Sequence, residues 1–321
     1  MNLDLNSIAQ HFSDPDAARL FLESQRWPDG VICPFCGLVG EAFRIRPKIW
    51  SKTPVRPGVW KCSGCRKQFT VTVGTIFEDS HIPLNLWLLA IHLLCSSKKG
   101  MSAHQLHRML GVTYKSAWFM VHRIRYAMRQ SDLFTKMGGT VEIDETYIGG
   151  KRRVPNMGQP GRLKRTAGHA PFANKQAVVS LVERDGSVQS HHVRRVTANN
   201  LRPIIEASIA LDAQIMTDSS TVLRGALKER KHFQLDHTNN EFVRYENGLK
   251  ITTNTVEGYF GLLKRGINGV YHHVGEQHLH RYLSEFDFRY NTRKITDGER
   301  TSRLIQQVHG KRLMYKQVKP A

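Results

Sequence analysis

Three acidic residues stand where they could bind a divalent metal ion. Asp144 follows the β-forming residues 141–143, and Asp218 follows a second apolar run at 215–217. Glu257 lies in the first turn of an expected helix that begins near Asn254. Three carboxylates suit the oxygen-ligand, octahedral chemistry of Mg²⁺ or Mn²⁺. Two such ions about 4 Å apart can activate a nucleophile and stabilise the leaving oxygen at a phosphodiester.

Glu257 has a competing structural explanation. Asn254 and Glu257 are spaced as an N-cap residue and its partner in a capping box, in which the Glu side chain returns to the backbone. Lys264 lies two helical turns further on the same face, where it could contact a phosphate, and Arg265 follows it. We expect Glu257 to be the third metal ligand, with Asn254 as the alternative.

Two CxxC pairs predict a second metal site. Cys33 and Cys36 form the first pair, and Cys62 and Cys65 form the second. Each turn can present two thiolates to one tetrahedral zinc ion, and the aromatic and β-branched residues between the pairs suit a small β-ribbon. Two unconnected redox pairs are the alternative. Cys95, the remaining cysteine, is expected to be a small core residue.

The composition points to a polyanionic partner. The chain of 321 residues has 47 Lys and Arg against 27 Asp and Glu, a net charge of +20. Such an excess favours nucleic acid over the alternatives, a ribosome-bound or membrane-surface protein. No apolar run approaches the ~18 residues of a membrane-spanning helix, and no signal peptide is recognisable. We expect a cytoplasmic, nucleoid-associated protein with no membrane partner.

A helix-turn-helix is predicted over residues 102–128. Ser102 can cap the first helix, Gly111 can end it, and Thr113 can cap the second. The second helix has an apolar stripe from Ala117 to Met128, and its N-terminal residues would enter the major groove. The side chains expected off that stripe, as DNA contacts, are Tyr114, Lys115, Ser116, His122, Arg123 and Arg125. A structural helix pair with a solvated basic face is the alternative.

Strand patterns begin near Gly139. The expected order is the first acidic strand, a hairpin around Asp185-Gly186, a helix over 197–210, the second acidic strand, and then further helices. Acids at the ends of the first and fourth strands and on a later helix are the arrangement of a ribonuclease H-like (retroviral integrase-like) α/β core. The segment 149–174 is rich in cations without a carboxylate, which suits phosphate binding; Lys151, Arg152 and Arg153 are its first three.

Several motifs together resemble one family. These are residues 26–30 (RWPDG), 110–115 (LGVTYK) with 122–125 (HRIR), 143–147 (IDETY), 254–258 (NTVEG) with 263–265 (LKR), 270–273 (VYHH) and 285–291 (EFDFRYN). They resemble bacterial insertion-sequence DDE transposases with an N-terminal zinc ribbon, the ISXO-type group related to Merlin transposons.

The resemblance implies cut-and-paste DNA transposition with Mg²⁺, in which Asp144 and Asp218 are metal ligands. Some relatives have Asn and others Glu in the third segment, so the choice between Glu257 and Asn254 stays open. The implied partners are double-stranded DNA, as element ends and target, and at least one further copy of the chain, because pairing two ends requires a dimer or larger assembly.

Four regions are expected. They are 1–80 (N-terminal helix and zinc ribbon), 81–135 (helical, with the helix-turn-helix), 139–300 (catalytic core) and 301–321 (basic C-terminal tail).

Two other functions fit parts of the sequence. A tyrosine recombinase could use His278, Arg281 and Tyr315, but it needs a mainly helical catalytic domain. A non-catalytic DNA-binding regulator derived from a transposase would rely on the ribbon and helix-turn-helix alone. The histidine-rich stretch from His272 to His280 could bind zinc, although a structural or DNA-contacting role is favoured.

Overall fold

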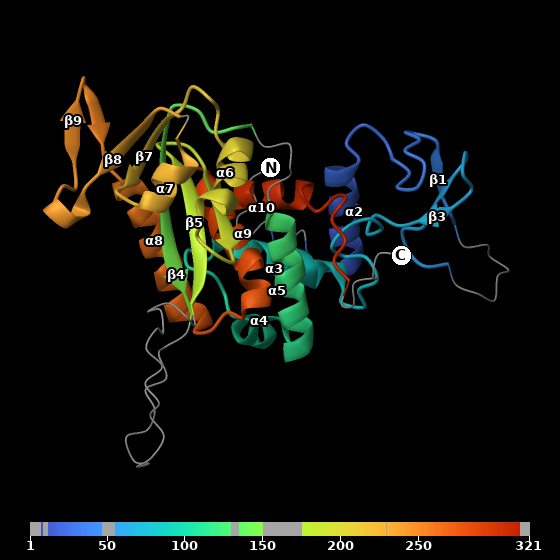
Figure 1. Ribbon diagram of the computed structural model, residues 1–321. Coiled ribbons are helices and arrows are strands. Elements are labelled where there is room, and N and C mark those ends of the chain that lie inside the picture. The colour runs from blue at the N-terminus through green and yellow to red at the C-terminus, as the bar shows by residue number, and fades with distance from the viewer. Residues whose placement is uncertain are drawn as a thin grey trace, which may run out of the picture. The chain divides into compact units, whose positions relative to one another are not determined.

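The computed structural model describes residues 8, 12–46, 55–129, 135–149, 175–228 and 230–314. The chain divides into two compact units, which are considered separately (Figure 1). Unit 1 comprises Met1–Arg129 and Thr292–Ala321, and unit 2 comprises Gln130–Asn291. The expected boundary between residues 131 and 139 lies close to the junction at residue 130.

Unit 1 combines a small sheet with helices. Its elements are α2 (Pro15–Arg26), β1 (Ala42–Arg44), β2 (Trp60–Cys62), β3 (Gln68–Phe69), α3 (Leu84–Ser96), α4 (Ala103–Leu110), α5 (Tyr114–Met128) and α10 (Asp297–Gln306). The strands form one antiparallel sheet in the order β1-β2-β3. Trp27 packs edge-on against Trp60 and Phe69, so the end of α2 supplies the apolar base of the ribbon.

The predicted helix boundaries of the pair α4 and α5 are confirmed. Ser102 accepts a hydrogen bond from the Gln105 amide, and Thr113 accepts one from the Ser116 amide. Gly111 ends α4 in the left-handed conformation at φ 66°, which glycine adopts without a Cβ penalty.

The expectation of a basic tail over 301–321 is wrong for its first half. Helix α10 continues to Gln306, and Thr301, Leu304 and Ile305 are buried. The helix begins with a full capping box between Thr296 and Glu299, a signal present in the sequence. Residues 292–314 therefore belong with unit 1 and not with the core expected over 139–300.

Unit 2 is a mixed α/β domain. Its elements are β4 (Thr140–Ile148), β5 (Gln176–Glu183), β6 (Val188–Val193), α6 (Ala198–Ser208), β7 (Gln214–Asp218), α7 (Thr221–Ala226), β8 (His232–Leu235), η1 (His237–Asn239), β9 (Arg244–Glu246), β10 (Leu249–Ile251), α8 (Asn254–Gly266), η2 (Ile267–Tyr271) and α9 (Glu276–Asn291). Five strands form a sheet in the order β6-β5-β4-β7-β8. β4, β5 and β6 pair antiparallel, whereas β7 and β8 run parallel to β4. The expected order from β4 to β7 is confirmed, but β8 and the hairpin β9–β10 were not anticipated.

Alternation along the central strands gives the sheet two apolar faces. Val141 and Ile143 of β4 pack in one cluster that includes Leu201 and Ile205 of α6. Val178 and Val182 of β5 pack on the opposite face against α8 and α9. Since residues two apart on a strand share a face, Glu142 and Asp144 point to the α8 side of β4.

A buried polar network fastens α8 and α9 to the sheet. The Tyr259 hydroxyl of α8 donates to Asp287 of α9 at 2.6 Å, and the Ser190 amide and hydroxyl of β6 donate to the same carboxyl at 2.8 and 2.7 Å. Burial raises the pKa of Asp287 to about 6, although the hydrogen bonds from Tyr259 and Ser190 oppose that rise. The network therefore holds α8 against α9 and β6.

No helix in the described ranges has the length and apolar character that crossing a bilayer requires.

Replacement of Tyr259 by Phe should weaken this attachment. We expect the free energy of unfolding of unit 2 to fall by about 1–3 kcal/mol at pH 8, where Asp287 is ionised and loses one of its donors. Because the folded-state pKa of Asp287 lies above its ordinary value, ionisation is costly in the folded state, and the cost is absent near pH 4 and complete above about pH 6. The loss in the variant should therefore be smaller at pH 5 than at pH 8. Denaturant titrations at both pH values measure it, and an equal loss at both would contradict this account.

Candidate functional site

Asp144 and Asp218 lie on neighbouring parallel strands. Glu142 and Met216 form the last residue pair between β4 and β7. Asp144 lies two residues beyond Glu142, and Asp218 lies two residues beyond Met216. Both acids therefore lie at the point where the pairing between these two strands has ended, although β4 continues to Ile148 beside β5. The Asp144 carboxylate accepts a hydrogen bond from the Glu145 amide at 2.7 Å, and Asp218 accepts one from the Ser220 amide at 3.0 Å.

The pKa of Asp144 shows which charges surround it. Burial raises this pKa most, and the negative charges of Asp218, Glu145 and Glu257 raise it further, to about 7, against the lowering effect of the Glu145 amide. The geometry agrees: β7 pairs with β4, and the amide of Val256, the residue before Glu257, donates to Glu142 of β4 at 3.0 Å. The structure brings together the three acids that the sequence singled out.

Glu257 is not the partner of an N-cap asparagine. The helix begins one residue earlier than expected, with Thr253 as the N-cap and Asn254 as the first helical residue. The structure therefore does not support the competing explanation, a capping box between Asn254 and Glu257. The Glu257 side chain, which is 49% exposed, accepts a hydrogen bond from the Thr253 hydroxyl at 2.9 Å. Asn254 is also exposed at this end of α8.

Two cations continue the exposed face of α8. Lys264 lies two turns beyond Glu257 and is exposed, as is Arg265, whose guanidinium donates to the Gly261 carbonyl at 3.0 Å. Lys151, Arg152 and Arg153 fall outside the described residues.

Sequence reasoning missed two residues at the site. Glu145 was read only as part of the acidic strand, yet its pKa is raised by burial and by the charge of Asp218. His237 follows β8, and its Nε2 lies 3.2 Å from the Thr253 hydroxyl and 3.8 Å from the Glu257 carboxylate. The sequence signal for His237 was the Asp236-His237 pair directly after β8, because an acid after a strand repeats the pattern at Asp144 and Asp218.

The donor set fits a hard divalent cation. Glu145 Oε2 is buried without a hydrogen-bond partner among the described residues, and the charges of Asp218 and Glu257 act on its neighbour Asp144. A cation would offset this crowding of negative charge. The acids are more widely spaced than the four cysteines described next. Among the described residues, those cysteines are the one group of three or more potential ligands, and their ligand atoms lie within 4.8 Å of one another.

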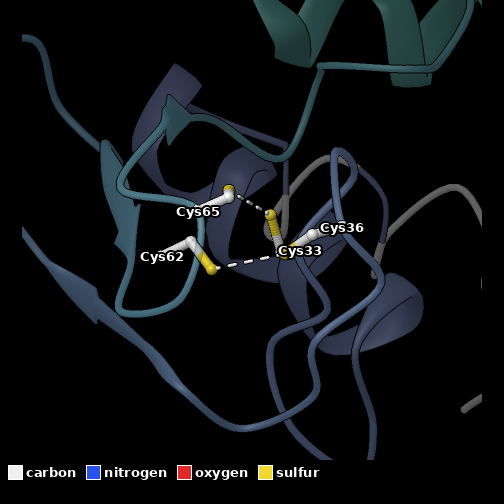
Figure 2. A group of neighbouring side chains, drawn as sticks. All are labelled: Cys33, Cys36, Cys62 and Cys65. Carbon is white, nitrogen blue, oxygen red and sulfur yellow. Dashed lines mark hydrogen bonds between the residues drawn. The ribbon is translucent and has the colours of Figure 1, made fainter.

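Four cysteines converge in unit 1. Figure 2 shows Cys33 and Cys36 on one loop facing Cys62 and Cys65 on the other. Cys33 Sγ lies 3.6 Å from Cys65 Sγ, and Cys36 Sγ lies 3.6 Å from Cys62 Sγ. A tetrahedral ion with Zn–S bonds of about 2.3 Å separates its sulfurs by about 3.8 Å. The arrangement therefore fits one zinc ion and does not fit two independent redox pairs.

The environment of Cys33 favours a thiolate. Burial raises the pKa of this thiol, but hydrogen bonds from the Phe35 and Cys36 amides outweigh it, and the pKa falls to about 7. Cys95, the remaining cysteine, is buried within α3, as expected for a core residue.

The expected DNA contacts on α5 divide into two groups. Tyr114 and Lys115 are exposed at the N-terminal end of the helix, and Ser116 is partly exposed. His122, Arg123 and Arg125 are buried, so the expectation that they face outward is wrong.

Arg123 illustrates the reason. Its guanidinium donates to the carbonyls of Ile76 and Glu78 at 2.7 and 2.8 Å, and it lies over the Phe119 ring. The middle of α5 is buried more widely than its apolar stripe indicated, because arginine satisfies backbone carbonyls there.

Two other sequence hypotheses find no support. The histidines between His272 and His280 form no group of ligands among the described residues. His278 and Arg281 lie on α9 of a mixed α/β unit and not in the mainly helical domain that a tyrosine recombinase needs. Tyr315 is outside the described residues.

The cysteine cluster predicts one zinc ion per chain. Replacement of Cys62 by Ser should reduce bound zinc by at least about tenfold and lower the melting temperature of unit 1, because a ribbon of this size depends on its metal. Elemental analysis of the purified full chain measures the zinc. Cys95→Ala is the control and should keep one ion; zinc retained in Cys62→Ser would contradict the assignment.

The acid cluster predicts a stabilising substitution. Asp144 is costly to ionise in the folded protein because its pKa of about 7 exceeds the ordinary 3.8, so this cost is absent below about pH 4 and complete above about pH 7. In EDTA, Asp144→Asn should melt at a higher temperature than wild type at pH 8, and the difference should shrink at pH 5.

Asp212→Asn, at an exposed carboxylate of the same unit, should change neither value. A lower melting temperature for Asp144→Asn at both pH values would exclude the crowding of charge described above.

Comparison with known proteins assigns both parts of the chain. Residues 13–68 match the transposase zinc-ribbon domain, and residues 136–291 match the ISXO2-like transposase domain. An uncharacterised protein in the transposable element ISH50 of Halobacterium salinarum is 25% identical over 292 residues, which covers 88% of this chain and 92% of that relative. The chain belongs to the ISXO2-like DDE transposases that carry an N-terminal transposase zinc ribbon.

Proposed function

We propose that this protein is an active transposase, which binds the terminal inverted repeats of its insertion sequence and performs metal-dependent DNA cleavage and strand transfer. The observation that carries the proposal is that the three segments bearing Asp144, Asp218 and Glu257 lie together, since β7 pairs with β4 and the start of α8 is hydrogen-bonded to β4. The ISXO2-like domain covers all three residues, and the relative from ISH50 is named as part of a transposable element.

The topology of unit 2 supports a ribonuclease H-like core. Three antiparallel strands, a helix and two strands parallel to the first give the order β6-β5-β4-β7-β8, with Asp144 and Asp218 just beyond the last residues that pair β4 with β7. An enzyme of this fold gathers its carboxylates from strands that are distant in sequence.

Asp144, Asp218 and Glu257 would hold Mg²⁺ or Mn²⁺, which when bound polarises the scissile phosphodiester and activates water or a 3′-hydroxyl. Lys264, exposed on the face of α8 that carries Glu257, would contact a phosphate beside the scissile bond. Arg265 extends the same cationic face along the DNA backbone. Asn254 is the alternative third ligand, since it is exposed one turn before Glu257.

DNA recognition would fall to unit 1. Tyr114, Lys115 and Ser116 stand at the exposed start of α5, the end of a second helix that enters a major groove in helix-turn-helix proteins. The zinc ribbon adds a second DNA-binding module. Cleavage at two element ends would require at least a dimer.

Substitution of the acids tests this proposal. Asp144→Asn, Asp218→Asn and Glu257→Gln should each lower 3′-end cleavage of DNA carrying the flanking inverted repeats by about 10³-fold or more, with DNA binding unchanged. Asp212→Asn should cleave like wild type. Gel analysis of cleavage in Mg²⁺ and in Mn²⁺, beside a binding assay, gives both quantities.

The same assay resolves the third ligand. Asn254→Ala should retain most cleavage if Glu257 is the ligand, whereas loss in Asn254→Ala with survival in Glu257→Gln would assign the role to Asn254. Specific binding by the wild-type protein without cleavage in any metal would contradict the enzyme and favour a DNA-binding regulator.

A further inference from the structure

We propose that Glu142 and Arg184 are positioning residues of the transposase, which hold the start of α8 against β4 and so set the separation of Glu257 from Asp144. This inference rests on the proposed function of the acids. Neither residue would touch DNA or metal; each would act through the segments that carry the ligands.

Glu142 anchors the first turn of α8. Its side chain is fully buried, yet it carries a carboxylate in the middle of the sheet. That carboxylate accepts hydrogen bonds from the amides of Thr255 and Val256 at 2.8 and 3.0 Å, and from the Thr255 hydroxyl at 2.9 Å. The free amides and partial positive charge of a helix N-terminus favour an anion at this place. One carboxylate on β4 thereby fixes the helix whose next residue is Glu257.

Arg184 binds the other side of the same carboxylate. Its Nε donates to Glu142 at 2.8 Å, and its terminal nitrogens donate to the carbonyls of Lys250 and Thr252 at 2.6 and 3.1 Å. A further contact at 2.8 Å joins Arg184 to the sulfur of Met216. The guanidinium therefore links the end of β5 to β7 and to the segment that leads from β10 into α8.

The contacts of the pair lie next to each proposed metal ligand. Glu142 precedes Asp144 by two residues on the same face of β4, and Met216 precedes Asp218 by two residues on β7. Val256 directly precedes Glu257. The pair thus connects all three ligand-bearing segments at one point below the site.

This connection opposes the electrostatic repulsion within the site. The carboxylates of the site repel one another, and α8 is the element that could relieve the repulsion by moving away from β4. Hydrogen bonds from the helix to Glu142 act against that movement. A buried ion pair that merely stabilised the fold would not need to bridge these segments, and burial of an ion pair is by itself weak evidence of stabilisation.

Three variants test the proposal in the zinc-loaded full chain. Glu142→Gln places an amide group among four donors that need an acceptor. Thr255→Val removes only the hydroxyl that donates to Glu142, and Thr255→Ser retains it. Leu201→Ala, which opens a cavity on the face of the sheet opposite α8, serves as the control for lost stability.

The primary readout is Mn²⁺ binding, followed by electron paramagnetic resonance of the free ion at a temperature where every variant is folded. Loss of a positioning partner should weaken the Asp144-dependent Mn²⁺ site by about tenfold or more in Glu142→Gln and about threefold in Thr255→Val. Thr255→Ser and Leu201→Ala should bind Mn²⁺ like wild type. The Mg²⁺ concentration for half-maximal DNA cleavage should shift in the same order.

The outcomes separate this inference from the proposed function. An Asp144-dependent Mn²⁺ site that is unchanged in Glu142→Gln and Thr255→Val would overturn the positioning role and leave the proposed function standing. Equal weakening in Leu201→Ala would also overturn it, because general loss of stability would then explain the effect. Wild-type protein without an Asp144-dependent site would overturn both. If Glu142→Gln does not fold, Thr255→Val against Thr255→Ser decides the question.

Discussion

Repulsion among the carboxylates that lie near Asp144 is the constraint on which unit 2 depends. Burial raises the pKa of Asp144 most, and the charges of Asp218, Glu145 and Glu257 raise it further. The fold holds the acids together by packing both faces of the sheet and by two buried polar networks, one at Tyr259 and one at Glu142. The carboxylates therefore lower the stability of the fold at the site where we expect the chemistry to occur.

The zinc ribbon of unit 1 is stabilised in another way. Its three strands are only two or three residues long, too short to enclose a core of their own. The sheet is instead completed by the end of α2, where Trp27 packs on Trp60, and by four cysteines with the spacing of a zinc site. A net charge of +20 over the whole chain suits the binding of a DNA backbone. Metal and polyanion therefore account for most of the unusual composition.

The sequence predicted those features that depend on local chemistry. The caps at Ser102 and Thr113, the cysteine cluster and the acidic strands at Asp144 and Asp218 are all where residue types and spacing indicated. Helix boundaries were less accessible, because the start of α8 at Asn254 depends on contacts of Thr255 and Val256 with Glu142, which is distant in sequence.

Burial of charge was the other limit. Arg123 and Glu142 appear in the sequence as ordinary charged residues, and only the folded chain shows which backbone groups they satisfy. The same is true of His237, which reaches the site because β8 extends the sheet beside β7. Long-range pairing of this kind leaves no periodic signal in the chain.

Anomalous X-ray diffraction from crystals of the full chain grown with Mn²⁺ would locate the metal. We expect manganese bound by carboxylate oxygens of Asp144, Asp218 and Glu257 in unit 2, with Glu142 outside its ligand sphere. Manganese that is bound elsewhere, or that is held by Asn254 while Glu257 points away, would exclude this metal site.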